Sequence, residues 1–394
     1  MNTGKIFLEV GNDQIQKHGN CVCGDIFLSR KIKEEQRAVT VLSDGLGSGV
    51  KANILASMTS SMALNFTLLN EPAERIADII INTLPIDKQR KIGFASFTVV
   101  DVDSEGNTNI LEFGNPEFIL IRDNKRLKLQ RKKISFAGNA KINQRLFHSS
   151  FQAQKEDRIL FFSDGVTQSG IGRKDMPFGW GGDVEVYVKN MIANVSDISA
   201  KDMAKRLVCR AIQNDISKPQ DDITAAVMYF RKPRKMLICT GPPYNEERDK
   251  MLSEKIRDFD GVKMVCGGTT AMILSRELNR PIEVDIFSGK MGLPPVSNIE
   301  GIDLVSEGIL TVGRVASILE NYNSSDVLED STAGDIIKQF FLHDEIEFVV
   351  GTRVNEAHQD PTLPVELEIR RNVIKKIASV LEEKLLKKVK IQFV

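Results

Sequence analysis

Short apolar runs separated by turn residues dominate the first 230 residues. AVTVLS (38–43) and RILFFS (158–163) each end directly before an Asp-Gly pair, and ITAAVMYF (223–230) follows an Asp-Asp pair. Runs of this kind, bounded by glycine and aspartate, predict buried strands that end in turns. Residues 93–122 contain three more such runs, which predict a meander. This part of the chain is therefore predicted to be rich in strands.

One long helix is predicted directly after the first Asp-Gly turn. Its apolar residues recur at spacings of three and four, and they are Val50, Ile54, Met58, Met62, Phe66 and Leu69. Such spacing places them on one face, which we expect to pack onto the core. The preceding Gly47, Ser48 and Gly49 either present N–H groups to a phosphate or simply turn the chain, with Ser48 as N-cap. The sequence favours neither reading.

The pattern of apolar and polar residues changes after the basic stretch RKPRK (231–235). From there to residue 394, strand-like runs alternate with helical segments. This alternation predicts an α/β layered domain, and a chain of 394 residues is long enough for two domains. We therefore expect a first domain at residues 1–232 and a second, regulatory or ligand-binding, at residues 236–394.

Composition narrows the class of protein. The chain has 53 basic and 53 acidic residues, so its net charge supports neither nucleic acid nor an anionic membrane as a partner. It has no apolar run of 18 residues and no apolar signal-peptide core at its N-terminus. Its five cysteines are scattered and odd in number, which suits reduced thiols. We expect a cytoplasmic protein; its oligomeric state is not indicated.

Acidic residues stand where several strand-like runs begin or end. The four motifs are Gly24-Asp25, Asp44-Gly45, Asp164-Gly165 and Asp221-Asp222. Carboxylates at strand ends can converge at one edge of a sheet, and hard divalent cations prefer such oxygen ligands. A glycine after the acid allows a sharp turn that brings its carbonyl to the same ion. A single Asp-Gly pair is more often only a turn, but the combined set favours a metal site over solvated turn acids.

Four segments carry a resemblance to a known family. VLSDGLGSGVKAN (41–53), RILFFSDGVTQS (158–169), QDDITAAVMYF (220–230) and CGDIFLS (23–29) resemble motifs of the type 2C metal-dependent protein phosphatases. The resemblance is greatest to the bacterial branch typified by stage II sporulation protein E, and it spans about residues 20–230. It implies an α+β fold: a two-sheet β-sandwich flanked by helices, with the metals at one end.

The resemblance also implies a role for each acid. Asp44 would bridge two divalent cations, Mn²⁺ or Mg²⁺, and the Gly45 carbonyl would ligate one of them. Asp164 and Asp221 would hold the second ion, and Asp25 would lie beside the first, through water. Asp44, Asp164 and Asp221 are thus the expected catalytic residues, and a water between the ions would attack phosphorus in line. The expected substrate is a phosphoserine or phosphothreonine of a regulatory protein.

Two other functions remain open. One is a non-catalytic signalling or binding module in which metals only stabilise the fold; the complete set of Asp44, Asp164 and Asp221 argues against it. The other is a phosphatase of a small phosphorylated metabolite. Activity on a phosphopeptide, compared with a metabolite panel, separates these functions.

The second domain resembles no family that we recognise, but four of its loops follow strand-like runs and precede helices. Small and hydroxyl residues at such positions bind ligands in open α/β sheets, although turns and helix caps use the same residues. These loops of the second domain are therefore candidates for binding a small-molecule effector. Neither a Walker loop nor a G-x-G-x-x-G motif is present, so nucleotide binding is not supported. The candidate residues are Gly267, Gly268, Thr269, Thr270, Glu307, Arg353, Asn355 and His358.

Overall fold

The computed structural model divides the chain into two compact units, Met1–Lys232 and Pro233–Val394, which are described separately. The described residues are 6–32, 34–83, 95–135, 145–284, 297–306, 308–322, 327–353, 363–385 and 387–394.

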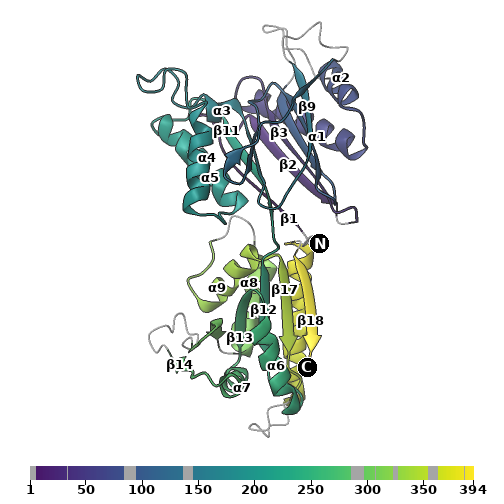
Figure 1. The fold of residues 1–394 in the computed structure, drawn as a ribbon, viewed down its shortest axis with the longest axis vertical. Helices are drawn as coiled ribbons and strands as arrows, with labels where there is room; N and C mark the ends of the chain where they lie inside the picture. The colour runs from purple at the N-terminus through teal and green to yellow at the C-terminus, as the bar shows by residue number, and fades with distance from the viewer. Residues whose placement is uncertain are drawn as a thin grey trace. The chain divides into compact units, whose positions relative to one another are not determined.

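The first unit contains two antiparallel sheets (Figure 1). The six-stranded sheet has the order β2 (Asp25–Ile32), β3 (Arg37–Asp44), β4 (Ser96–Val102), β5 (Asn107–Phe113), β9 (Leu146–Gln152) and β8 (Lys132–Ile134). The five-stranded sheet has the order β1 (Phe7–Ile15), β11 (Ile223–Arg231), β10 (Arg158–Phe162), β6 (Ile119–Arg122) and β7 (Lys125–Arg126). Its helices are α1 (Val50–Leu68), α2 (Ala73–Thr83), α3 (Asp164–Thr167), α4 (Asp183–Asn194) and α5 (Ala200–Asn214).

Three buried clusters order these elements into layers. Leu42 and Val100 of one sheet pack against Phe161 and Met228 of the other, which places a core between the sheets. Helices α1 and α2 cover the outer face of the six-stranded sheet, and α4 and α5 cover the outer face of the five-stranded one. The predicted α+β fold, a two-sheet β-sandwich flanked by helices, is confirmed.

Helix α1 is present as predicted, but of the six residues predicted to share its apolar face only Met62 and Phe66 pack against the core. Val50 and Ile54 are 63% and 53% exposed, whereas Ala52 and Ala56 are fully buried. The reason is close approach of the helix to the sheet: a Cβ on Gly45 would lie only 2.0 Å from the carbonyl oxygen of Ala52. Only small residues fit between backbones this close, so Val50 and Ile54 at the start of the helix face outward, whereas Met62 and Phe66 further along it pack against the core.

One reading of the Gly47–Gly49 turn and one prediction about the meander are not borne out. The N-cap of α1 is Gly49, with φ 75°, and no side chain caps the helix, so Ser48 does not take that role. Strands β4 and β5 form a hairpin, but the third strand of the expected meander, β6, lies in the other sheet. The loop between β5 and β6 is anchored inside the sandwich, because buried Asn115 donates to the Leu42 carbonyl and to Thr98 Oγ1.

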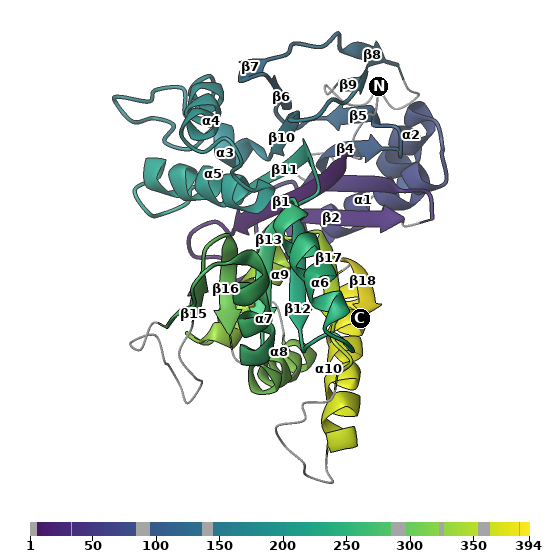
Figure 2. The same cartoon turned by 60° about the horizontal axis from the view of Figure 1, so that its bottom comes forward.

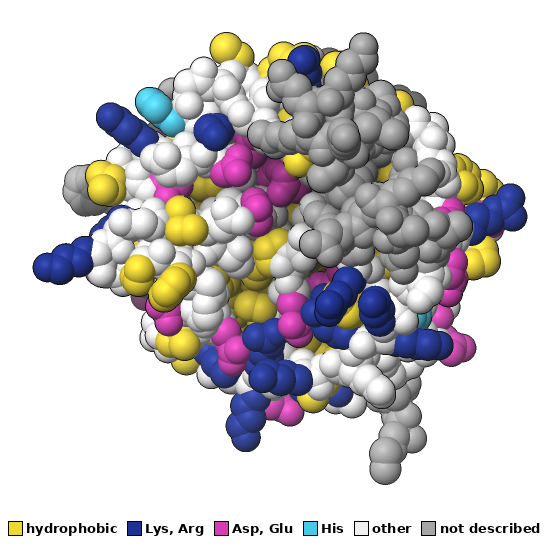
Figure 3. All heavy atoms as spheres, turned by 90° about the horizontal axis from the view of Figure 1, so that it is seen from above, with side chains coloured by type: hydrophobic (Ala, Val, Ile, Leu, Met, Phe, Trp, Pro, Cys, Tyr) yellow, Lys and Arg dark blue, Asp and Glu magenta, His cyan; other side chains and the backbone are white. Residues whose placement is uncertain are grey.

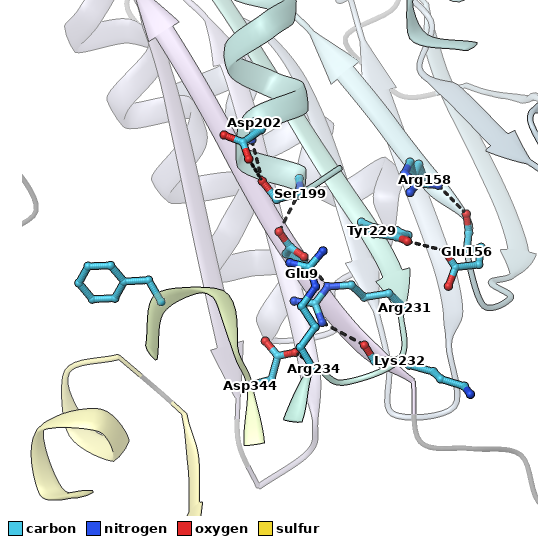
Figure 4. A network of polar contacts seen from close by, with 12 residues as sticks. Glu9, Glu156, Arg158, Ser199, Asp202, Tyr229, Arg231, Lys232, Arg234 and Asp344 are labelled. Atoms are coloured by element: carbon cyan, nitrogen blue, oxygen red, sulfur yellow. Dashed lines mark hydrogen bonds and ion pairs between the residues drawn. The ribbon is translucent and has the colours of Figure 1, made fainter. Parts of the chain in front are cut away.

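A polar network ties the first and last strands of this unit together (Figure 4). The Glu9 carboxylate on β1 accepts hydrogen bonds from the Ala200 N–H at the start of α5 and from Arg231 Nε on β11. The Glu9 and Arg231 side chains are 16% and 6% exposed, so this ion pair is shielded from water. Arg231 Nη1 also donates to the Lys232 carbonyl at 3.0 Å. Strands far apart in sequence are thereby fixed side by side.

The second unit contains one seven-stranded sheet with helices on both faces (Figure 2). The strand order is β14 (Glu283–Val284), β15 (Ser297–Ile299), β16 (Ile302–Ser306), β13 (Val262–Cys266), β12 (Lys235–Thr240), β17 (Glu345–Val350) and β18 (Lys388–Phe393). The strands from β16 to β18 are parallel, and the predicted α/β layered domain is confirmed. Helices α6 (Glu247–Asp258) and α7 (Gly268–Leu278) cover one face; α8 (Ile309–Asn321), α9 (Thr332–Leu342) and α10 (Leu363–Glu383) cover the other.

All five cysteines are free thiols, and Cys239 and Cys266 are buried in the second unit. Within the described residues, no helix combines the length and the apolar character that crossing a membrane requires.

Candidate active site at the acidic end of the sandwich

Strand pairing places two of the predicted acids opposite each other. Asp25 begins β2, Asp44 ends β3, and the two are direct partners in the antiparallel register. Residues that are direct partners point to the same face of a sheet. The Gly45 N–H donates to the Gly24 carbonyl at 3.3 Å, which extends the pairing by one step.

The other sheet contributes the remaining acids. Asp164 follows the end of β10 and Asp221 precedes the start of β11, and Ser163 and Thr224 hold these ends together. The Ser163 N–H donates to the Thr224 carbonyl, and the Thr224 N–H donates to Ser163 Oγ, both at 3.0 Å. A Cβ on Gly24 would lie 2.6 Å from Asp222 Oδ2, so the acidic ends of both sheets meet.

The gathered carboxylates raise one another's pKa. Burial raises the pKa of Asp44 well above its usual range, and repulsion from Asp25, Asp164 and Asp221 adds to the effect. Burial also raises the pKa of Asp25, to about 7, and that of Asp164 and Asp221. Acidic side chains gather around a hollow on the face seen in Figure 3. Such concentrated negative charge favours bound protons or bound cations.

The residues present fit divalent cations. Asp25 is fully buried, and neither of its carboxylate oxygens has a hydrogen-bond partner. Every available donor is an oxygen, as hard cations such as Mg²⁺ and Mn²⁺ require. As the side chains stand, no group of three or more His, Cys, Asp or Glu among the described residues has the geometry of a formed metal site. The carboxylates lie close enough to raise the pKa of Asp44 and Asp221, and their side chains would have to rotate to ligate an ion.

Asp221 and Asp222 differ in their surroundings. Asp222 is 3% exposed, and its Oδ1 accepts a hydrogen bond from the Lys17 N–H at 3.0 Å. Asp221 is half-buried and feels the charge of Asp164. Each carboxylate accepts one backbone N–H, since Asp221 Oδ1 accepts from the Asp222 N–H at 2.9 Å, but only Asp222 is tied to a distant segment.

Several residues that support the site were not found from the sequence. Gln168 Nε2 donates to Asp164 Oδ2 at 2.8 Å, and Asn53 Nδ2 on α1 donates to the Cys23 carbonyl at 2.8 Å. Gln168 stands one turn after Asp164 on a helix that the sequence did not predict. The pattern of apolar and polar residues therefore did not indicate that Gln168 supports the site.

A polar pocket of about 420 Å³ lies near the ends of β5 and β9. It lies at the same end of the sheet as Asp44, because Phe113 pairs with Phe97, which pairs with Ser43. Its Arg131 forms ion pairs with Glu112 and Glu117, so much of its positive charge is balanced inside the pocket.

The candidate residues of the second unit divide into three groups. Gly267 lies directly before α7, and Gly268, Thr269 and Thr270 form its first turn. Arg353 lies in another loop, after β17, with its Nη1 3.6 Å from a Glu246 carboxylate oxygen. Glu307, Asn355 and His358 lie outside the described residues.

Comparison with known families agrees with this geometry. The family model described as Stage II sporulation protein E (SpoIIE) matches residues 34–231, half of the chain. Fold and site together define a domain of the type 2C serine/threonine protein phosphatase class. The chain belongs to the stage II sporulation protein E family. The match contains Asp44, Asp164 and Asp221 and begins after Asp25.

Solved structures give similarities at low identity. The phosphatase domain of the cell-fate determinant SpoIIE from Bacillus subtilis, with a fragment of its regulatory domain, is 17% identical over 58% of this chain, with TM-score 0.48. The alignment covers 63% of that chain, less than two thirds. The RsbU and RsbW domains of a Mycobacterium tuberculosis protein are 16% identical, over 65% of this chain and 69% of that one, with TM-score 0.46. A serine/threonine phosphatase of S. agalactiae is 15% identical, over 57% and 99%, with TM-score 0.40. No curated protein matches the chain.

Proposed function

We propose that the first unit is a metal-dependent phosphatase that removes phosphate from serine or threonine of a regulatory protein. The observation that carries this proposal is the convergence of four acidic motifs at one end of the sandwich, with the buried Asp25 carboxylate unpaired. Asp44 and the Gly45 carbonyl would hold one Mn²⁺ or Mg²⁺, and Asp44, Asp164 and Asp221 the second. Asp25 would act on the first ion through water.

When bound, two such cations supply a nucleophilic water at neutral pH and offset charge on the phosphoryl oxygens. The chain's own residues position this chemistry. The β2–β3 pairing holds Asp44 beside Asp25, and Gln168 orients the Asp164 carboxylate by a hydrogen bond. Because the site is buried, the attraction between its carboxylates and a cation is stronger than the same attraction in water.

A covalent cysteine mechanism has no support at this site. The nearest thiol, Cys23, is two residues before Asp25, and burial raises its pKa to about 12. The thiolate is the nucleophilic form, so this thiol stays unreactive at neutral pH. An attack by water fits the site better than an attack by sulfur.

The test is hydrolysis of p-nitrophenyl phosphate by the full chain, with and without Mn²⁺. We expect metal-dependent turnover that Asp44→Asn lowers at least about 10²-fold, the size of losing one strong electrostatic contact to a transition state. Asp123→Asn, in the exposed β6–β7 turn, is the matched control and should keep full turnover. A folded wild type without turnover in Mn²⁺ or Mg²⁺ would favour the non-catalytic module instead.

The substrate class needs a second measurement. Because the chain belongs to the stage II sporulation protein E family, we expect a phosphoserine or phosphothreonine peptide to be hydrolysed with a higher kcat/KM than any member of a phosphorylated metabolite panel. The reverse order would make the protein a metabolite phosphatase.

A further inference from the structure

The strand order of the second unit reverses at β12. One neighbour, β13, is reached through α6 on one face of the sheet; the other, β17, is reached after α8 and α9 on the opposite face. Strands β16, β13, β12 and β17 are parallel, so their carboxyl ends share one edge. Open α/β sheets bind ligands at this edge, beside the point where the strand order reverses.

Three loops meet at this edge, each with a glycine: Gly241 after β12, Gly267 after β13 and Gly308 after β16. A Cβ on Gly267 would lie 3.9 Å from both the Gly241 nitrogen and the Gly308 Cα. The Gly267 N–H donates to the Ser306 carbonyl at 2.8 Å, which ties two of the loops together. The loops therefore approach one another with backbone alone, and Gly267 is only partly buried. These three loop segments, Gly241, Gly267 and Gly308, are called the glycine cradle.

A buried hydroxyl in the glycine cradle has no partner. Thr270 is 0% exposed, and its Oγ1 forms no hydrogen bond. This atom lies 3.4 Å from the position that a Cβ on Gly267 would take, so it faces the cradle. An unpaired buried hydroxyl costs free energy. A ligand atom that accepts its hydrogen bond would recover that cost.

A helix N-terminus and a guanidinium lie beside the glycine cradle. Thr270 lies in the first turn of α7, an eleven-residue helix whose first N–H groups have no partner within the helix. Arg370 of α10 places Nη1 2.5 Å from the position of a Cβ on Gly241, which brings a guanidinium to the neighbouring loop. Backbone N–H groups, a hydroxyl and a nearby cation together suit a phosphate.

We propose that the second unit binds the phosphate group of a small phosphorylated metabolite in the glycine cradle. The N–H groups of Gly268 and Thr269 and the Thr270 hydroxyl donate to the phosphate oxygens. This site is separate from the acidic site of the first unit and does not depend on phosphatase activity. It makes the second unit a sensor of a small anion.

The test uses the full chain in EDTA, so that phosphate cannot bind through divalent ions at the acidic site. Hydrogen–deuterium exchange of residues 266–274 is followed as inorganic phosphate is added, with chloride at equal ionic strength as the reference. We expect phosphate to slow exchange in this segment and not in residues 41–53. The same protocol is then repeated with a panel of phosphorylated metabolites.

Two variants and one control sharpen this test. Gly268→Asp adds a carboxylate next to Gly267 of the cradle without a clash, since no atom lies within 4 Å of the new Cβ, and an acid in the first turn stabilises a helix. We expect it to abolish the phosphate effect while the fold is kept. Thr270→Val keeps the side-chain shape, and loss of one hydrogen bond to a charged group should weaken phosphate binding on the order of tenfold. Thr332→Asp, in the first turn of α9, is the control and should bind as the wild type does.

Two results would overturn the proposal. One is a wild type in which neither phosphate nor any phosphorylated metabolite slows exchange in residues 266–274. The other is a Gly268→Asp variant that phosphate protects as strongly as it protects the wild type.

Discussion

Burial and charge conflict at Asp25. Its carboxylate is fully buried, and burial raises its pKa to about 7, although the nearby Ser163 and Thr224 hydroxyls favour the ionised form. In the unfolded chain this group has an ordinary pKa near 4. The folded state therefore holds its proton more tightly than the unfolded state between those values. The resulting stability is fully present below about pH 4 and is lost as the pH rises through 7.

Asp25→Asn removes this titration. In EDTA we expect the variant to exceed the wild type in free energy of unfolding at pH 8, by about 2–4 kcal/mol, with little difference at pH 4. Urea unfolding at the two pH values measures this, and Asp123→Asn is the exposed control. An Asp25→Asn variant no more stable than the wild type at pH 8 would show that Asp25 carries no such penalty.

The adjacent acids Asp221 and Asp222 permit a matched comparison. Asp222 already accepts the Lys17 N–H, and an asparagine oxygen can keep that bond. We expect Asp221→Asn to lower Mn²⁺-dependent turnover at least about 10²-fold and Asp222→Asn less than about tenfold. Steady-state kinetics on a phosphopeptide decide; equal losses in both variants would refute the assignment of Asp221 alone.

The formation of helix α1 and the choice of its buried face have different causes. The spacing of its apolar residues predicts a helix, because side chains three and four apart share a face. Its burial follows from a different cause, the close approach of Ala52 to Gly45. Small residues line the contact, and no periodicity of large residues reveals it.

Substitutions on the two faces of α1 should differ in how much they lower the free energy of unfolding. Ala56 is fully buried, so Ala56→Leu overpacks the contact and should lower the free energy of unfolding by about 1–3 kcal/mol. Ile54 is 53% exposed, so Ile54→Ala should change it by less than about 0.5 kcal/mol. Urea titrations compare them, and a larger loss for Ile54→Ala would contradict the observed face.

At the scale of the molecule, the chain consists of two units with separate cores. The clusters of the first unit draw only on residues up to Phe230, and those of the second begin at Met236. Each unit closes its own sheets with its own helices, so each has what an independent domain requires.

Fragments test this independence. We expect residues 1–232 and 233–394, made separately, each to unfold in one cooperative urea transition. Residues 1–232 should keep Mn²⁺-dependent turnover within about tenfold of the full chain, since all four acidic motifs lie in that fragment. Circular dichroism follows the urea unfolding of each fragment, and p-nitrophenyl phosphate assays measure the turnover of residues 1–232. A fragment without cooperative unfolding would show that the units stabilise each other.

The sequence by itself determined the strand-rich first part, the α/β rhythm of the second, and the acidic motifs, because these depend on local spacing and on the chemistry of single residues. Tertiary structure decided what depends on distant partners. It placed β6 in the five-stranded sheet, where it pairs with β10, and it buried the alanine face of α1. It also brought Asp222 into a hydrogen bond with the Lys17 N–H. It brought Gly241, Gly267 and Gly308 together at one sheet edge. Each of these outcomes rests on contacts between segments far apart in the chain, which no local pattern records.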